Sequence, residues 1–348
     1  MSKLKEFLVG VEERLIEITV HKSAFITEVM QHLLLSGGKR VRPTLVYYGS
    51  QFTNDSQNTD VSALINAAAA IELCHLGSLY HDDIMDASEF RHQVPSAHIK
   101  YGEDIGIVAG DMLFAQSAML GNMLQKRAST LLSDAFFRLC EGQINETVLE
   151  KGEKIYASLP KTVDSINAQI NSGAKTPESV QFDEYITIVS GKTSALFSAS
   201  LTMGAVIANS DDETINSLAK YGENLGIAYQ ITDDILDIVG ESGKSAGLDI
   251  KGDVQSIVVM LLKQKVRDSS ATASEREANK ILQMPNLTDQ NIADALCLIA
   301  KSSIIDDARE IAQEYTTNAL VAISALTPYA LGYKTLTEFA KVMLDRVS

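Results

Sequence analysis

Apolar residues recur at helical spacing along almost the whole chain, and no strand-turn-strand rhythm appears. This pattern predicts a protein built from amphipathic and buried helices. A helix stop is expected at Ser36-Gly37-Gly38, and proline suits the first turn of the helix that follows. Helices are expected over 3–35 (as a pair), from near Pro43, over 61–86, 110–125, 130–150, 182–209 and 213–239, and then with short polar breaks to residue 348.

Polar stretches separate these expected helices. Residues 51–60 and 91–95 are expected to be loops, and a glycine-rich loop is expected over 240–252. Residues 151–181 are weakly periodic and polar, which predicts an insertion or a mobile segment. No clear linker divides the chain, so we predict a single all-α domain over residues 1–348.

Composition agrees with a helical protein and disfavours one class of partner. The 348 residues are 45% hydrophobic, with 21 Gly and 6 Pro, which supplies a large core and few turns. The net charge of −15 disfavours nucleic acid as a partner. An acidic protein still binds anionic substrates when local cations or metal ions reverse the field.

Export and membrane signals are not visible in the sequence. The first residues are amphipathic and carry acids, unlike an export signal, and no apolar run is expected to reach the ~20 residues that span a bilayer. The three cysteines, Cys74, Cys140 and Cys297, are scattered through apolar text, as expected in a reducing compartment. We therefore expect a cytoplasmic protein without a transmembrane segment.

Two acidic clusters share the pattern D-D-x-x-D. Each lies within an apolar segment of helical periodicity, where bare carboxylates are costly to bury. They are Asp82-Asp83-Ile84-Met85-Asp86 and Asp233-Asp234-Ile235-Leu236-Asp237. On a helix the first and last aspartates lie about 40° apart, while the middle one lies about 100° off and can bind a metal or support its ligands. Magnesium prefers such oxygen ligands and bridges them to phosphates, so the two sets suggest a diphosphate substrate.

A solvated helix end with scattered acids is the simpler explanation for either cluster alone. It weakens because both clusters share one spacing, end apolar helices and precede loops with cations. Lys and Arg in glycine-rich surroundings clamp phosphate oxygens, although each alone is more often a surface cation. The cations concerned are Lys39, Arg40, Arg42, Arg91, Lys192 and Lys244.

With these motifs in view, the chain resembles the trans-prenyl diphosphate synthases, also called polyprenyl synthetases, over most of its length. The matching motifs, in order, are GGKRVRP at 37–43, ELCHLGSLYHDDIMD at 72–86, GD at 110–111, GKT at 191–193, QITDDILD at 230–237 and GKSAGLD at 243–249. The resemblance implies an all-α bundle around a deep central cavity, usually as a homodimer. It also implies Mg²⁺-dependent condensation of isopentenyl diphosphate with an allylic diphosphate.

The resemblance also implies a role for each matching residue. Asp82, Asp86 and Asp233 would hold Mg²⁺, three ions once substrate is bound, with Asp83 and Asp237 assisting and Asp234 and Lys192 counted with the catalytic groups. Arg91, Lys192, Thr193, Gln230 and Lys244 would serve the allylic diphosphate. Lys39, Arg42, His75 and His92 would serve isopentenyl diphosphate.

Two positions depart from the family pattern. His92 stands where the family has a second arginine, and Asp253 stands where it has lysine. Both changes remove a cation near diphosphate, although a histidine still donates a hydrogen bond and its charge depends on pH. These departures keep open a second reading, a non-catalytic subunit of a heteromeric synthase. A class I terpene cyclase shares the ionisation chemistry, but GGKRVRP argues against it because a cyclase needs no isopentenyl site.

Small residues on the 61–86 helix suggest a long product. Gly77 and Ser78 lie about one turn before Asp82 on the expected cavity side, and Cys74 and Ala70 continue that face for about 18 Å below Asp82. Short-chain members of the family place an aromatic residue near this point as a floor. We therefore expect a product of C20 or longer, unless Leu73 or a neighbouring helix closes the channel.

Overall fold

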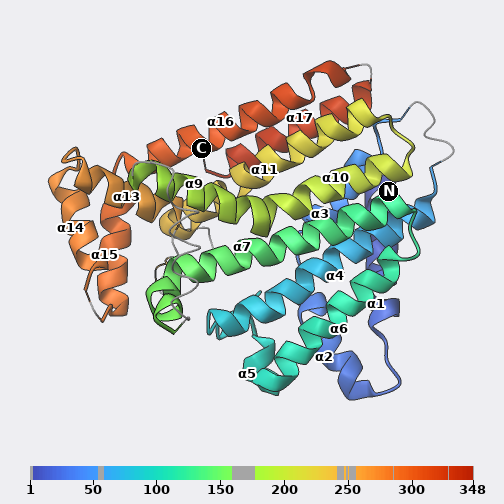
Figure 1. Ribbon diagram of the computed structural model, residues 1–348, viewed down its shortest axis with the longest axis horizontal. Coiled ribbons are helices and arrows are strands. Elements are labelled where there is room, and N and C mark those ends of the chain that lie inside the picture. The colour runs from blue at the N-terminus through green and yellow to red at the C-terminus, as the bar shows by residue number, and fades with distance from the viewer. Residues whose placement is uncertain are drawn as a thin grey trace. The chain divides into compact units, whose positions relative to one another are not determined.

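The computed structural model of the chain describes residues 3–53, 59–158, 177–240, 247, 250, 256–284, 286–327 and 329–347, and this part is almost entirely helical (Figure 1). Its α-helices are α1 Lys3–Thr19, α2 Ala24–Leu35, α3 Val41–Gly49, α4 Val61–Met85, α5 Ala97–Tyr101, α6 Glu103–Gly121, α7 Lys126–Ser158, α9 Pro177–Val189, α10 Ala195–Ile207, α11 Asp212–Val239, α13 Ile257–Arg267, α14 Ala273–Leu282, α15 Asp289–Ile299, α16 Ile304–Ala322 and α17 Ala330–Asp345. The all-α prediction is confirmed.

The chain forms two compact units. The first unit comprises Met1–Phe137, Ser194–Glu223 and Asn318–Ala340, and the second comprises Arg138–Thr193, Asn224–Thr317 and Lys341–Ser348. The first aspartate cluster belongs to the first unit and the second cluster to the second unit. That the whole chain is one domain stays a prediction.

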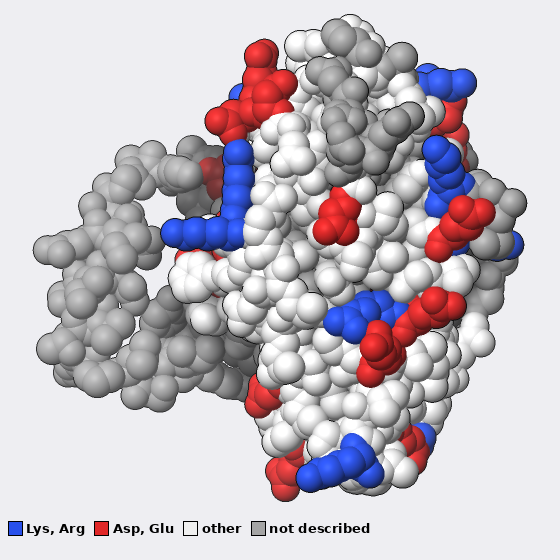
Figure 2. Space-filling view, turned by 90° about the vertical axis from the view of Figure 1, so that its right-hand side faces the viewer, with Lys and Arg blue, Asp and Glu red and all other residues white. Residues whose placement is uncertain are grey.

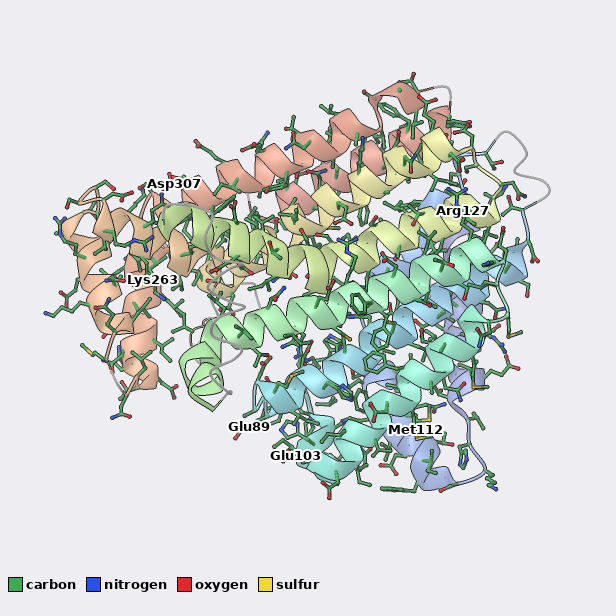
Figure 3. The ribbon with its side chains drawn as sticks, viewed as in Figure 1. Glu89, Glu103, Met112, Arg127, Lys263 and Asp307 are labelled. Carbon is green, nitrogen blue, oxygen red and sulfur yellow. The ribbon has the colours of Figure 1, made fainter. Side chains whose placement is uncertain are left out.

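Helix α4 is the centre of the first unit and packs against α1, α3, α6 and α10 (Figure 1). Its run Ala67–Ala70 is fully buried, and such small side chains let neighbouring helices approach closely. A side chain on Gly49 of α3 would overlap the carbonyl of Leu201 in α10, so glycine is required for that contact. At the unit's surface, Arg127 near the start of α7 pairs with Asp212 of α11 at 2.6 Å (Figure 3).

Helix α4 is also long and apolar enough, by length and composition, to cross a membrane. The expectation that no apolar run reaches this length is wrong, because runs of alanine carry the apolar character between scattered polar residues. In this structure 67% of the helix's most apolar window is buried inside the protein, which is the position of a core helix.

The second unit has its own core, built from one face each of α9, the end of α11 and α13 to α16. Reciprocal capping boxes fix the starts of α14, at Thr272 and Glu275, and of α15, at Thr288 and Asn291. The chain's final segment joins this core, because Val347 is buried and its carbonyl accepts a 2.5 Å hydrogen bond from Arg309 Nε.

Several expected boundaries need correction. Helix α6 begins at Glu103 rather than at Gly110, because Gly110 is an interior packing residue that abuts His81 of α4. Helix α7 runs on to Ser158 and α9 begins at Pro177, so both ends of the expected polar segment 151–181 are helical, and residues 159–176 lie outside the described residues. The expected loop at 91–95 contains a hairpin of β1, Phe90–Arg91, and β2, Val94–Pro95.

The surface charge is mixed on the face shown in Figure 2. Lys and Arg side chains lie as separate small groups next to Asp and Glu, with uncharged residues between them.

Candidate functional site

The first aspartate cluster lies at the end of helix α4, and its three aspartates differ in solvent exposure. Asp82 is half-buried, Asp86 is exposed at the C-cap, and Asp83 is fully buried. The amide of Asp86 donates to the carbonyl of Asp82 at 2.9 Å, so the helical spacing expected from the motif holds to its last residue. The two outer carboxylates are thus the members accessible to solvent and to a metal ion.

Asp83 holds a cation of the adjoining hairpin. Arg91 Nε donates to Asp83 Oδ1 at 2.8 Å, and Arg91 Nη2 lies 2.6 Å from the same oxygen. The other carboxylate oxygen, Oδ2, is buried without a hydrogen-bond partner. The role of Asp83 is therefore indirect: it orients Arg91, the residue predicted to contact the allylic diphosphate.

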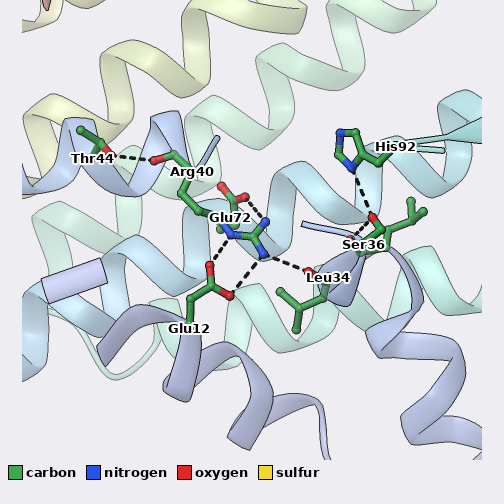
Figure 4. Close-up of polar contacts among 8 residues, drawn as sticks. Glu12, Leu34, Ser36, Arg40, Thr44, Glu72 and His92 are labelled. Atoms are coloured by element: carbon green, nitrogen blue, oxygen red, sulfur yellow. Dashed lines mark hydrogen bonds and ion pairs between the residues drawn. The ribbon is translucent and has the colours of Figure 1, made fainter. Parts of the chain in front are cut away.

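The glycine-rich loop before α3 brings the predicted isopentenyl residues into one region. Lys39 is exposed, and the Arg42 guanidinium lies 5.6 Å from the centre of the Phe197 ring. Arg40 between them is buried and paired with Glu12 and Glu72 (Figure 4). The three cations of this motif, at positions 39, 40 and 42, thus have three environments, which the spacing alone did not distinguish.

His75 lies among these cations on α4. Burial first, and then the charges of Arg42, Arg91 and His92, hold the pKa of His75 well below its ordinary value. The imidazole is therefore neutral near pH 7 and surrounded by positive charge. The structure brings the predicted group of Arg42, His75 and His92 together within the first unit.

His92 takes up an unusual backbone conformation. His92 and Gln93 have φ of 48° and 67°, as the two central residues of a tight hairpin turn do. Ser36 Oγ and His92 Nδ1 lie 3.3 Å apart, which ties the hairpin to the glycine-rich loop (Figure 4). His92 is exposed, at the position where the family pattern has arginine.

In the second aspartate cluster, which belongs to the second unit, the buried middle aspartate has different partners. Asp234 is buried and accepts hydrogen bonds from Gln230 Nε2 at 3.0 Å, Tyr185 Oη at 2.9 Å and the amide of Ile257 at 2.9 Å. Burial raises the pKa of Asp234 to about 6, against the effect of these donors. Asp234 therefore anchors the start of α13 and orients Gln230, rather than pointing toward solvent.

Asp233 carries a partner that sequence reasoning missed. Arg346, just after α17, places Nη1 3.0 Å from Asp233 Oδ1 and its guanidinium 5.6 Å from the Tyr229 ring centre. Nothing in the sequence marked a single arginine so far along the chain as a partner of this cluster. Asp233 and Asp237 are both half-buried, one helical turn apart.

Lys192 stands on a π-helical turn, Ser190–Ser194, between α9 and α10. Its ammonium pairs with Glu146 of α7, which also accepts a 3.1 Å hydrogen bond from Gln143. Thr193 Oγ1 donates to Gln230 Oε1 at 2.9 Å, and Gln230 donates to Asp234, so Thr193 belongs to the second cluster's hydrogen-bond network. Glu146 was missed, although its position four residues after Gly142, a tight packing partner of Gly191, could have signalled it.

The predicted product-channel residues divide into two groups. A side-chain carbon on Gly77 would lie 2.9 Å from the Phe114 ring and 3.1 Å from the carbonyl of Gly110, so Gly77 packs against α6. Its small size therefore serves helix packing, and its assignment to the product channel stays a prediction. Ser78 and Cys74 are buried with small side chains one and two turns before Asp82.

The outer aspartates supply carboxylate oxygens, the donor type that magnesium takes in proteins. Among the described residues, no three His, Cys, Asp or Glu side chains converge as a metal-binding group, so the metal ligands stay a prediction. Lys244 and Asp253 lie outside the described residues, so their roles stay predictions.

Comparisons with known proteins agree with this site. The family described as Polyprenyl synthetase matches residues 23–297. The chain is 29% identical over 324 residues to a nonaprenyl diphosphate synthase of Mycobacterium tuberculosis, covering 92% of this chain and 87% of that protein. It is 31% identical over 307 residues to a short chain isoprenyl diphosphate synthase of Methanocaldococcus jannaschii, covering 86% and 83%.

A solved structure gives the same result. The chain resembles a geranylgeranyl pyrophosphate synthase of Corynebacterium glutamicum, solved with calcium and isoprenyl diphosphate, at a TM-score of 0.76 and 25% identity, covering 99% of this chain and 96% of that one. The chain therefore belongs to the polyprenyl synthetase family and is a trans-prenyl diphosphate synthase, an all-α prenyltransferase of isoprenoid biosynthesis.

Proposed function

We propose that this synthase condenses isopentenyl diphosphate with an allylic diphosphate in a Mg²⁺-dependent reaction, and that its product is C20 or longer. The family uses divalent metals and takes these two substrate types. The observation that carries the proposal is that Arg91 is held at 2.6 Å by the buried Asp83, between Asp82 and Asp86 at the end of one helix. This helix end thus offers carboxylates for metal ions and a cation for a diphosphate, and His75 lies two turns earlier on the same helix.

The allylic diphosphate would be bound through the outer aspartates. As the family resemblance implies, Asp82, Asp86 and Asp233 would hold Mg²⁺, with three ions when substrate is bound. The metal supplies charge neutralisation for the departing diphosphate. Lys192, positioned by Glu146, and Gln230, positioned by Asp234, would donate to its oxygens.

Isopentenyl diphosphate would be bound by Lys39, Arg42, His75 and His92. As the allylic carbon–oxygen bond breaks, the electron pair leaves with the diphosphate and an allylic cation remains. The isopentenyl double bond attacks this cation, a carbon–carbon bond forms, and a proton passes to the released diphosphate. Neutral His75 fits a hydrogen-bonding role better than a third cationic one.

The product length rests on the residues below Asp82. Ser78 and Cys74 are both small, so neither side chain by itself forms the aromatic floor of a short-chain synthase at that depth. Relatives range from a short-chain to a nonaprenyl diphosphate synthase, so the family does not decide the length. Ser78→Phe should shorten the product, because an aromatic ring one turn before Asp82 would fill the channel.

The deciding experiment supplies purified protein with Mg²⁺, isopentenyl diphosphate and, in turn, C5, C10, C15 and C20 allylic primers. Extracted products are separated by chromatography. Products of C20 or longer support the proposal, and a wild-type enzyme that stops at C15 contradicts the length. No turnover with any primer would favour the alternative, a non-catalytic subunit of a heteromeric synthase, for which the exposed His92 is the motivating observation.

We also infer that the protein acts as a homodimer in the cytoplasm. Large apolar side chains are exposed on α6 (Val108 and Met119), in the turn that follows it (Met123) and on α7 (Phe137). Exposed apolar side chains that gather on one surface mark an association site. Light scattering should then show a dimer for the wild type and a monomer for Met119→Glu. A subunit of a heteromeric synthase would instead be a monomer as wild type, until a different chain is added.

A further inference from the structure

Arg40 stands in the glycine-rich loop between two predicted substrate cations, yet it is bound entirely within the protein. It is only 9% exposed. Its Nε donates to Glu12 Oε1 at 2.5 Å and its Nη2 to Glu12 Oε2 at 3.3 Å; its Nη1 donates to Glu72 Oε1 at 2.9 Å. Nη2 also donates to the carbonyl of Leu34 at 3.0 Å (Figure 4). One guanidinium thus connects α1, α2 and α4.

The backbone of the loop is shaped around this side chain. Arg40 has φ 47° and ψ 42°, a left-handed conformation that non-glycine residues adopt only when their surroundings require it. A side-chain carbon on Gly38 would lie 3.0 Å from Arg40 Nη1, so glycine leaves room for the guanidinium. Thr44 donates both its amide and its hydroxyl to the Arg40 carbonyl, at 3.0 and 2.8 Å, which fixes the start of α3.

The ion pair between Arg40 and Glu72 also affects Arg42, a predicted substrate ligand. Glu72 is 4% exposed and stands one helical turn before His75 on α4. Burial raises the pKa of Glu72, and Arg40 and then Arg42 oppose that rise, so both guanidinium groups lie within its field. A buried carboxylate that lost Arg40 would have Arg42 as its nearest remaining cation and would draw it in.

We propose that Arg40 is a positioning residue for the isopentenyl diphosphate site: by neutralising Glu12 and Glu72 and holding the left-handed turn, it keeps Arg42 and Lys39 directed at the diphosphate. Arg40 touches no substrate itself. The proposal rests on the proposed function, since it assumes that Arg42 binds isopentenyl diphosphate. Of the three cations in GGKRVRP, Arg40 thus has a structural role, and Lys39 and Arg42 bind the diphosphate.

The test compares Arg40→Gln with the double variant Arg40→Gln/Glu72→Gln in steady-state kinetics. Arg40→Gln should raise the KM for isopentenyl diphosphate about tenfold or more, the worth of one charge-assisted hydrogen bond, and leave the KM for the allylic substrate within about twofold. Removing the Glu72 charge as well should return the isopentenyl KM to within about threefold of wild type, because nothing then competes for Arg42.

A matched control is Arg127→Gln, which breaks the exposed pair with Asp212 in the same unit and should leave both KM values unchanged. Unfolding curves report whether each variant folds. If Arg40→Gln does not fold, Arg40→Lys replaces it: one ammonium cannot reproduce the forked contacts, so the isopentenyl KM should rise about threefold, and adding Glu72→Gln should reverse the rise.

Two results would overturn the proposal. One is an unchanged isopentenyl KM in a folded Arg40 variant; the other is an equal rise in both KM values that Glu72→Gln does not reverse, which is the result of general loosening. Failure of the proposed function is distinguishable, because it appears in the wild type as no turnover and no calorimetric binding of isopentenyl diphosphate.

Discussion

The two aspartate clusters share one motif but stabilise their buried middle aspartate in opposite ways. In the first, Asp83 faces the Arg91 guanidinium through one oxygen, and its other oxygen is buried without a partner. In the second, Asp234 accepts three hydrogen bonds from neutral donors. A charge–charge contact holds one, and dipoles hold the other.

The two clusters also differ in which of their aspartates pairs with an arginine. Arg91 binds the middle aspartate of the first cluster, whereas Arg346 binds Asp233, an outer aspartate predicted to hold metal. In the second cluster a guanidinium thus lies against an outer carboxylate oxygen, whereas in the first it lies against the buried middle one. Equal spacing in sequence therefore does not mean an equal charge environment.

The largest expected effect separates outer from middle positions in both clusters. Asp82→Ala and Asp233→Ala should each lower kcat about 10²–10³-fold, as loss of a group that stabilises developing charge does. Asp83→Asn and Asp234→Asn should each lower it by about tenfold or less, because those side chains are buried. Steady-state turnover with saturating Mg²⁺ measures this, with the exposed Asp212→Asn as control. Middle variants as damaging as outer ones would break the distinction.

The next effect distinguishes the two middle aspartates by stability. Arg91→Met leaves the Asp83 carboxylate buried without its cation and should lower the free energy of unfolding by about 3 kcal/mol. Adding Asp83→Asn removes the uncompensated charge and should recover most of that loss. Urea unfolding without metal gives both values. A single variant as stable as wild type would show that Arg91 does not hold Asp83.

The second cluster should instead show a pH dependence. Because the folded pKa of Asp234 is raised to about 6, this group favours the folded state when protonated. That contribution is fully present below about pH 4 and is lost as pH rises through about 6, roughly 2–3 kcal/mol in all. Metal-free unfolding at pH 4 to 8 should show the slope in wild type and less of it in Asp234→Asn. An identical slope in both proteins would assign it elsewhere.

The smallest effect concerns Arg346. Arg346→Gln removes the guanidinium from Asp233, so metal binding at that carboxylate should strengthen about threefold, while stability falls by less than about 1 kcal/mol for this part-exposed pair. Titration with Mn²⁺ by calorimetry checks the affinity. Lys341→Gln, an exposed cation on α17 with the same charge change, is the control. Weaker metal binding in Arg346→Gln would mean that the arginine supports the metal site instead.

Much of the fold and of the site could be predicted from residue pattern. Helical periodicity predicted the helices of the core, and the first D-D-x-x-D motif and the glycine-rich motif drew attention to acids and cations that both lie in the first unit. Gly110 shows where local signals fail, because it resembled a helix start while its neighbours in α4 require a small residue inside α6. Glu146 and Arg346 were missed because their partners lie far away in sequence.

The sequence by itself determined the all-α class, the family and the residue types of the site, because helical periodicity and short motifs are local properties that survive without knowledge of long-range contacts. Only the tertiary structure decided the environment of each charge: that Arg40 is bound by two glutamates, that Gly77 packs on α6, and that Asp83 meets a cation where Asp234 meets neutral donors. The physical reason is that burial and pairing depend on groups brought together from distant parts of the chain.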